Sequence, residues 1–349
     1  MLGVRLARPE QPLDDRWQRI SVTRRTNRRV GISFRPRQVE AFGLHGPATL
    51  ERLLGFRFEL IRLGAYWDRI EASPDQFDTG ELDWQLAAAE RSGKQVILGV
   101  GAIKNFGYPE FFVPKHHLPR PLKEGSLVRP ETHGALLDAA RRFVENVVTR
   151  YRDRDSIVAW QLEHEAVDPL GVEHSWRLGE DFVRRELETL KEGDPTRPVL
   201  MNGFLPMAPV VGVTQWWRTR DQGDSLAVAS RLAHIVGIDY YPRHALVKAG
   251  ARTLYVDGGG RAIAFDARGK RLMISEGQAE PWETTTTPPN PSGRTLYSCG
   301  PHHLLENFNA AMANPAIEAY LFWGAEYWVL REQSGDPTYL QAFARVLND

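Results

Sequence analysis

The stretch Ile157–Ala166 reads IVAWQLEHEA. Its first half is apolar and β-prone, and its second half ends in acid, base, acid. In a parallel barrel, buried strands deliver charged side chains at their carboxyl ends, where active sites are built. The stretch therefore predicts a barrel strand, and Glu165 at its tip is the first candidate catalytic residue.

Seven further β-prone runs alternate with stretches of helical spacing. The runs are Val30–Phe34, Phe58–Trp67, Gln95–Ala102, Val199–Phe204, Ile235–Pro242, Leu272–Trp282 and Glu318–Trp328. Helices are predicted near residues 47–54, 81–92, 132–151, 176–191 and 337–347. Eight strands that alternate with helices within 349 residues predict an α/β protein with a (β/α)8 TIM barrel.

Two segments depart from this alternation. Residues 252–271 (RTLYVDGGGRAIAFDARGKR) contain two β-prone runs around Asp257–Gly260, which predict a surface β-hairpin inserted before the seventh strand. Residues 1–29 are rich in Arg and Pro without a sustained period, so we expect a solvated N-terminal arm. No repeat or linker-like break divides the remainder, and residues 30–349 are predicted to form one catalytic barrel domain.

The charge balance and the cysteine count exclude several classes of protein. The 44 basic and 44 acidic residues give no net charge, so neither nucleic acid nor an anionic membrane surface is an expected partner. We see no apolar run that could span a bilayer and no apolar leader segment, which favours a cytoplasmic protein. The single cysteine, Cys299, excludes an internal disulfide and a cysteine metal cluster.

Carboxylates end the fourth and seventh predicted strands, at Glu165 and Glu276. These two strands face each other across the mouth of a barrel, so both side chains are expected to point into one small volume. Two facing carboxyl groups can cleave a glycosidic bond, because a protonated one can donate to the leaving oxygen while the other attacks the anomeric carbon. We expect a carboxyl separation of ~5–5.5 Å, which predicts retention of configuration.

The residues at these strand ends resemble those of the clan A retaining glycoside hydrolases, a TIM-barrel group that includes cellulase-like enzymes and β-galactosidases. Trp160–Glu165 reproduces the family's spacing on the fourth strand, where Trp precedes an Asn-Glu pair and the Glu is the acid/base. Glu276, in Ile-Ser-Glu, matches the family's nucleophile at the end of the seventh strand. Further matches fall on the second, sixth and eighth strands, at Arg62, Asp239-x-Tyr241 and Trp323.

The resemblance implies an activity and two catalytic residues. Glu165 is expected to be the acid/base and Glu276 the nucleophile of a retaining β-glycosidase that acts on an oligosaccharide or glycoside without a cofactor. One residue departs from the family pattern, because His164 stands where the family has Asn, which usually donates a hydrogen bond to the sugar 2-hydroxyl. Histidine can also donate, but it is larger and titrates near neutrality. The substitution leaves open a different sugar or a weakened or lost activity.

Other residues near the strand tips are candidates for supporting roles. Candidates for substrate binding are Arg62, His164, Tyr241, Trp323, Trp67, Trp282, Gln278 and Glu326, and candidates behind the catalytic pair are Glu163 and Asp239. Arg62 and the Tyr241 hydroxyl are expected to favour the charged form of Glu276. Glu276 and Glu163 are expected to raise the pKa of Glu165. A structural salt bridge between Arg62 and Glu163 is an equal alternative.

Two other functions stay open from the sequence. His164 favours a barrel that binds saccharide without cleaving it, and a metal-dependent hydrolase of the amidohydrolase type would use His and Asp ligands. The pairs His116-His117 and His302-His303 suggest metal ligands, but adjacent histidines point to opposite faces of a strand and diverge on a helix. The first predicted strand also lacks the His-x-His pair of such hydrolases, so no metal is expected.

Overall fold

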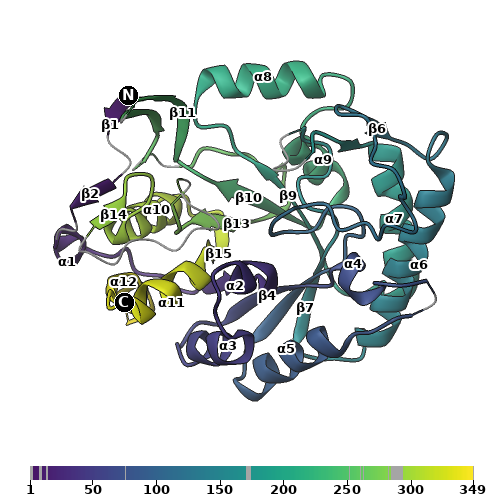
Figure 1. Cartoon of the computed structure of the whole chain (residues 1–349), viewed down its shortest axis with the longest axis horizontal. Coiled ribbons are helices and arrows are strands. Elements are labelled where there is room, and N and C mark those ends of the chain that lie inside the picture. Colours follow the sequence, from purple (N-terminus) through teal and green to yellow (C-terminus); the bar gives the residue numbers. More distant parts are fainter. Residues whose placement is uncertain are drawn as a thin grey trace.

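Eight parallel strands close into a barrel in the computed structural model, which confirms the predicted (β/α)8 fold (Figure 1). The structure describes residues 3–7, 10–12, 15–74, 76–169, 174–250, 252–259, 261, 263–281, 283 and 294–348. In chain order the barrel strands are β3 (Arg29–Ser33), β4 (Leu60–Gly64), β5 (Gln95–Gly99), β7 (Ile157–Gln161), β9 (Val199–Phe204), β10 (Ile235–Tyr240), β13 (Arg271–Gln278) and β15 (Ile317–Trp323). Each pairs with the next, and β15 pairs with β3 to complete the circle.

Five helices correspond to the predicted ones and alternate with the barrel strands. They are α3 (Gly46–Leu54), α5 (Gly80–Arg91), α6 (Gly134–Tyr151), α7 (Glu180–Gly193) and α12 (Thr338–Asn348). Further helices are α1 (Arg16–Arg19), α2 (Pro36–Ala41), α4 (Trp67–Ile70), α8 (Pro209–Thr219), α9 (Ser225–Leu232), α10 (Pro301–Met312) and α11 (Ala325–Gln333). None of the described helices is both long and apolar enough to cross a bilayer.

The last barrel strand is shorter than predicted. Residues 325–328, expected at the end of a strand, instead begin α11. Gly324 separates the two elements with φ of 112°, a backbone conformation that side chains with a Cβ rarely adopt. A Cβ at this position would also lie 2.4 Å from the Cβ of Glu280. The strand therefore ends at Trp323, which places this indole at the carboxyl end of the barrel.

Two apolar layers fill the molecule. The inner layer lies inside the barrel and takes at least one side chain from every strand except β3: Leu60, Ile97, Ala159, Leu200, Ile235, Met273, Ala319 and Leu321. The outer layer packs the helices against the strands, and one apolar stripe of α6 (Leu136, Leu137, Ala140, Phe143 and Val147) is buried in it. Because a packed interior fills the barrel, side chains at the carboxyl ends of the strands are free to build a site.

The insertion before the seventh strand differs from the predicted hairpin. β12 (Arg252–Asp257) pairs antiparallel with β11 (Arg243–Ala249) and with β1 (Gly3–Ala7), and the described residues of 261–267 form no strand. Gly259 allows close packing here, since a Cβ on this residue would lie 2.0 Å from the guanidinium of Arg243. Two small sheets pair β2 (Glu10–Pro12) with β14 (Arg294–Leu296) and β6 (Leu127–Val128) with β8 (Arg177–Leu178).

Candidate active site

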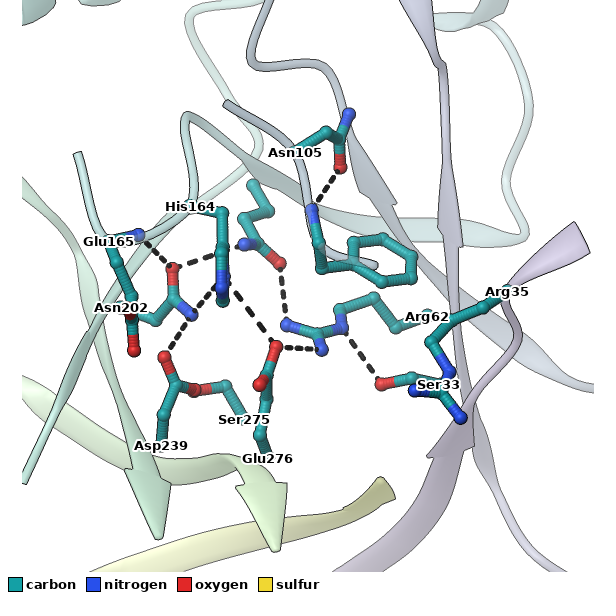
Figure 2. A network of polar contacts seen from close by, with 12 residues as sticks. Ser33, Arg35, Arg62, Asn105, His164, Glu165, Asn202, Asp239, Ser275 and Glu276 are labelled. Carbon is teal, nitrogen blue, oxygen red and sulfur yellow. Dashed lines mark hydrogen bonds and ion pairs between the residues drawn. The ribbon is translucent and has the colours of Figure 1, made fainter. Parts of the chain in front are cut away.

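Polar side chains from six barrel strands or their tips meet in one network at the carboxyl end of the barrel (Figure 2). β3 and β4 contribute Ser33 and Arg62, while His164 and Glu165 lie in the loop after β7. The remaining members come from β9, β10 and β13: Asn202, Asp239, Ser275 and Glu276. The side chains that carry charge are nearly inaccessible, with exposed fractions of 0–7%. Electrostatic contacts in this network are therefore poorly screened by water.

Glu276 is held by two donors. The Nη2 of Arg62 donates to its Oε1 at 2.5 Å, and the hydroxyl of Tyr241 donates to its Oε2 at 2.6 Å. Two donors on a buried carboxylate suit its ionised form. The structure thus joins Arg62 to Glu276 and not to Glu163, the partner that the sequence left equally open.

Arg62 is itself fixed in position. Its Nε donates to Ser33 at 2.9 Å and its Nη1 donates to the Oε1 of Gln161 at 3.2 Å. The guanidinium also lies 4.1 Å from the ring centre of Phe106, a cation–π contact. These contacts hold a rigid, planar cation against the oxygen of Glu276.

Asn202 connects the two sides of the network, although the sequence analysis did not select it. Its Oδ1 accepts from Gln161 Nε2 at 3.2 Å and from the backbone N–H of Glu165 at 3.4 Å. Its Nδ2 donates to Asp239 at 2.6 Å and to His164 Nδ1 at 2.9 Å. The signal that could have selected it is an amide near the end of an otherwise apolar strand, VLMNGF.

The proton of His164 can be assigned from these contacts. Arg62 only donates, so the Oε1 of Gln161 faces it and the Nε2 of Gln161 faces Asn202. Asn202 consequently turns its NH2 group toward His164, whose Nδ1 accepts. Burial, together with the charge of Arg62, holds the pKa of His164 well below its usual range. His164 is therefore a neutral imidazole that carries its proton on Nε2, with Nδ1 3.6 Å from Glu276 Oε1.

Glu165 occupies an environment that favours its protonated form. Burial raises its pKa well above the usual range, and the negative charges of Asp239 and Asp168 raise it further. We find no donor to its carboxyl group among the described residues, whereas Asp239 accepts from both Asn202 and Ser275. The carboxylate with the largest charge effect on Glu165 is thus Asp239, rather than Glu276 or Glu163 as the sequence suggested.

Glu163 points away from this network into a separate buried pair. Its two oxygens accept from the backbone N–H groups of Ile103 at 3.0 Å and Lys104 at 2.5 Å. Burial raises its pKa to about 7 and that of the neighbouring, fully buried Glu186 well above the usual range. Glu163 and Glu165 have φ angles of 49° and 42°, in the left-handed region. Two residues in this region within three positions break the strand-like alternation and send the side chains in different directions.

Asp239 lies close to two groups that could contribute to an ion site. Ligand atoms of His164, Asp239 and Glu276 all lie within 4.8 Å of one another. The same groups are already engaged by Asn202, Tyr241 and Arg62, and the arginine charge opposes a cation at this point. The arrangement is therefore better suited to proton transfer and carboxylate chemistry than to binding a metal.

Trp323 lies beside the network, as the sequence predicted for a strand tip. Its ring is 5.5 Å from the guanidinium of Arg62 and 4.3 Å from that of Arg35. Arg35 forms buried ion pairs with Glu280 and Glu326, both at 2.7 Å. Glu326 thus anchors the cation that packs on Trp323, a different position from the substrate contact that the sequence favoured.

Three other predicted contacts are not part of the network. Trp67 is fully buried, packs on Phe143 and donates its indole N–H to Glu71, which leaves no free ring face for a sugar. Gln278 is also buried and both bonds of its amide go to the backbone of Arg243. Trp282 lies outside the described residues.

No protein-family model matches this sequence. Its structure is similar to that of xylanase 10B from Thermotoga petrophila, solved with xylobiose, with a TM-score of 0.55 and 13% identity over 92% of this chain and 94% of that one. Xylanase 10B from Thermotoga maritima gives a TM-score of 0.55 and 14% identity over 92% and 95% of the two chains. An intracellular xylanase from Thermoanaerobacterium saccharolyticum, solved with xylotetraose, gives 0.52 and 12% over 86% and 87%. At these identities the chain shares with the xylanases their barrel fold.

Proposed function

We propose that this protein is a retaining β-glycoside hydrolase, in which Glu276 is the nucleophile and Glu165 is the acid/base. The observation that carries the proposal is the contrast between the two carboxyl groups. Glu276 receives two donors that suit its charged form, whereas burial and the charge of Asp239 raise the pKa of Glu165. A general acid must be protonated and a nucleophile must be ionised. The two roles therefore require carboxyl groups whose environments favour opposite protonation states.

The reaction would proceed in two displacements. Glu276 attacks the anomeric carbon and forms a covalent glycosyl-enzyme, while Glu165 gives its proton to the departing oxygen. Glu165 then takes a proton from water, whose oxygen attacks the anomeric carbon and releases Glu276. Arg62 and Tyr241 would orient the nucleophile, and the Nε2–H of His164 would donate to a sugar hydroxyl.

The substrate class is a β-linked saccharide. The barrel resembles xylanases, of which two were solved with xylobiose or xylotetraose, so β-xylosides are the first compounds to test. A broader panel of aryl β-glycosides should include galactoside, glucoside, mannoside, fucoside and glucuronide. Residues 30–349 would form the catalytic unit, with residues 1–29 as an arm.

The decisive experiment uses Glu276→Ala with the best substrate of this panel. The variant should lose hydrolysis, and azide or formate should restore part of the turnover and yield a product of inverted configuration. Glu332→Ala provides a control, because Glu332 forms a partly exposed ion pair with Arg52 and should leave turnover unchanged. Unimpaired hydrolysis by Glu276→Ala would refute the assignment.

A second candidate is a barrel that binds saccharide without cleaving it. His164 favours this function, since it replaces the amide of the resembling family and is fixed as a neutral imidazole beside Glu276. Calorimetry would distinguish the two functions. Binding of β-linked oligosaccharides without turnover over the whole glycoside panel would favour the second candidate.

A further inference from the structure

A second cluster of ligating side chains lies on loops at the carboxyl end of the barrel, apart from the network around Glu276. Glu71 follows α4, and His116 and His117 lie in the long segment between β5 and α6. The Nε2 atoms of His116 and His117 lie 3.1 Å and 2.8 Å from the same oxygen, Oε1 of Glu71. The three side chains are about equally accessible, with exposed fractions of 20–22%.

The local backbone explains why adjacent histidines converge here. The backbone N–H groups of His117 and Leu118 both donate to the carbonyl of Pro114, which makes a tight turn. The two imidazole centres are consequently only 4.3 Å apart. The sequence-based expectation that this pair diverges is wrong, because it assumed a strand or a helix and the pair lies on neither.

The carboxylate is held in position from behind. Trp67 donates its indole N–H to Oε2 of Glu71 at 2.7 Å, which leaves Oε1 directed at the histidines. The ring of His117 lies 4.9 Å from that of Trp67, which is fully buried. A hydrogen bond that orients a ligating side chain from outside is a regular feature of metal sites.

We propose that Glu71, His116 and His117 bind a divalent transition-metal ion of the zinc type. Zinc is commonly held by imidazole nitrogen and carboxylate oxygen at about 2.0–2.2 Å, and a tetrahedral site then has ligand–ligand edges of roughly 3.3 Å. The observed separations of 3.1 Å and 2.8 Å need a widening of a few tenths of an ångström in partly exposed side chains. Three protein ligands leave one position for solvent water, as in zinc sites with an open coordination position.

The charges around the cluster also favour a cation. In the part of the chain that the structure describes, Glu71 pairs with no Lys or Arg, in contrast to Glu276, which pairs with Arg62. The other pair of adjacent histidines contacts different groups, since His302 contacts Arg16 and His303 accepts from the backbone of Gly300. The cluster at Glu71 therefore combines two imidazoles with a carboxylate that has no Lys or Arg partner among the described residues. The bound ion would join the segment after β4 to the segment after β5.

The test is a titration of the chelator-treated full-length protein with Zn²⁺ by calorimetry, and with Co²⁺ by visible absorption. We expect one equivalent of Zn²⁺ per chain and the absorption bands of Co²⁺ with nitrogen and oxygen ligands. Loss of a residue that only orients a metal ligand weakens metal binding by at most about 100-fold. His117→Ala and Glu71→Gln should each weaken Zn²⁺ binding by more than this, because both residues are proposed as ligands. Glu71→Gln retains an oxygen that can accept from Trp67 and gains an NH2 group that can donate to a neutral histidine, so it separates ion binding from a hydrogen-bonded contact between the two segments.

A matched control is His174→Ala. His174 contacts Glu124 at 2.8 Å, which is a single histidine–carboxylate pair without a second imidazole, and its loss should leave the affinity for Zn²⁺ unchanged. Thermal unfolding with chelator present establishes that each variant is folded. Absence of saturable one-equivalent binding in the wild-type protein, or equal affinity in folded His117→Ala and Glu71→Gln, overturns the proposal. Glu276→Ala should bind Zn²⁺ as the wild-type protein does, so this result is independent of the proposed hydrolase activity.

Discussion

Replacing Arg62 with Met tests how much the buried ion pair between Arg62 and Glu276 stabilises the folded protein. Arg62 and Glu276 are exposed by 0% and 2%, and Nη2 lies 2.5 Å from Oε1. Loss of one partner of a buried ion pair leaves the other charge uncompensated, at a cost of about 3–5 kcal/mol. Met retains an unbranched apolar chain but removes the hydrogen bonds to Glu276, Ser33 and Gln161.

The expected loss of stability can be expressed as a change in melting temperature. An unfolding entropy of about 2.1 cal/mol/K per residue gives roughly 0.7 kcal/mol/K for 349 residues. A loss of about 3–5 kcal/mol therefore lowers Tm by about 4–7 °C, which differential scanning calorimetry resolves. In Arg62→Met/Glu276→Gln neither charge is left alone, so its loss should be smaller than the sum of the two single losses by about 1–3 kcal/mol.

The control for this cycle is Arg52→Met, which breaks the partly exposed pair between Arg52 and Glu332. Exposed pairs contribute at most about 1 kcal/mol, so this variant should shift Tm by no more than about 1 °C. An Arg62→Met shift as small as this one, or strictly additive losses in the double variant, would refute the assignment of the Arg62–Glu276 pair as the stabilising contact.

Three further predictions concern pH. Because Glu165 must be protonated to donate, kcat/KM should fall as pH rises through its raised pKa. Glu165→Gln should abolish this alkaline limb and lower kcat/KM on alkyl glycosides by about 10²–10⁴-fold. Asp239→Asn removes a carboxyl group whose charged form raises the pKa of Glu165, so the alkaline limb should move to lower pH; an unmoved limb would contradict the coupling. Burial raises the pKa of Glu186 well above the usual range and that of Glu163 from 4.5 to about 7. The folded protein thus binds more protons than the unfolded chain, Tm should decrease between about pH 5 and pH 8, and Glu186→Leu should flatten that decrease.

The barrel and much of the network follow from simple sequence patterns. Strands that are buried on both faces appear as continuous apolar runs, and their alternation with helical stretches determines a parallel barrel. Since all parallel strands end at the same rim, polar residues at the ends of such runs must meet there. For this reason Arg62, Tyr241 and Glu276 could be expected at one rim without knowledge of any loop, although the strand ends left Arg62 equally open to Glu276 and Glu163.

The features that could not be anticipated depend on backbone conformation outside the strands. Glu163 and Glu165 would share a face if the strand continued, but both residues adopt the left-handed region and their side chains separate. His116 and His117 would diverge on a regular element, but a turn brings them onto one oxygen of Glu71. Neither conformation has a pattern in the sequence, because non-glycine residues with positive φ and short turns are set by tertiary contacts.

The orientation of Asn202 determines which ring nitrogen of His164 carries the proton. A fixed sequence of donors and acceptors runs from Arg62 through Gln161 and Asn202 to His164. Each step allows a single orientation, because the guanidinium cannot accept and each amide has one oxygen and one NH2 group. The imidazole must then keep its proton on Nε2, so it offers one hydrogen-bond donor at that nitrogen.

The fixed direction of these hydrogen bonds requires an NH2 donor at position 202. Asn202→Asp preserves the shape of the side chain but replaces its NH2 group with a second acceptor, which would face Nδ1 of His164 and the carboxylate of Asp239. The imidazole should then take up a proton, and its pKa should rise from the low value that burial and Arg62 impose. NMR titration of His164 would measure this change, with Asn202→Ala as the variant that removes the donor without adding charge. An Nδ1 of His164 that stays unprotonated in Asn202→Asp would contradict the assigned direction of the hydrogen bonds.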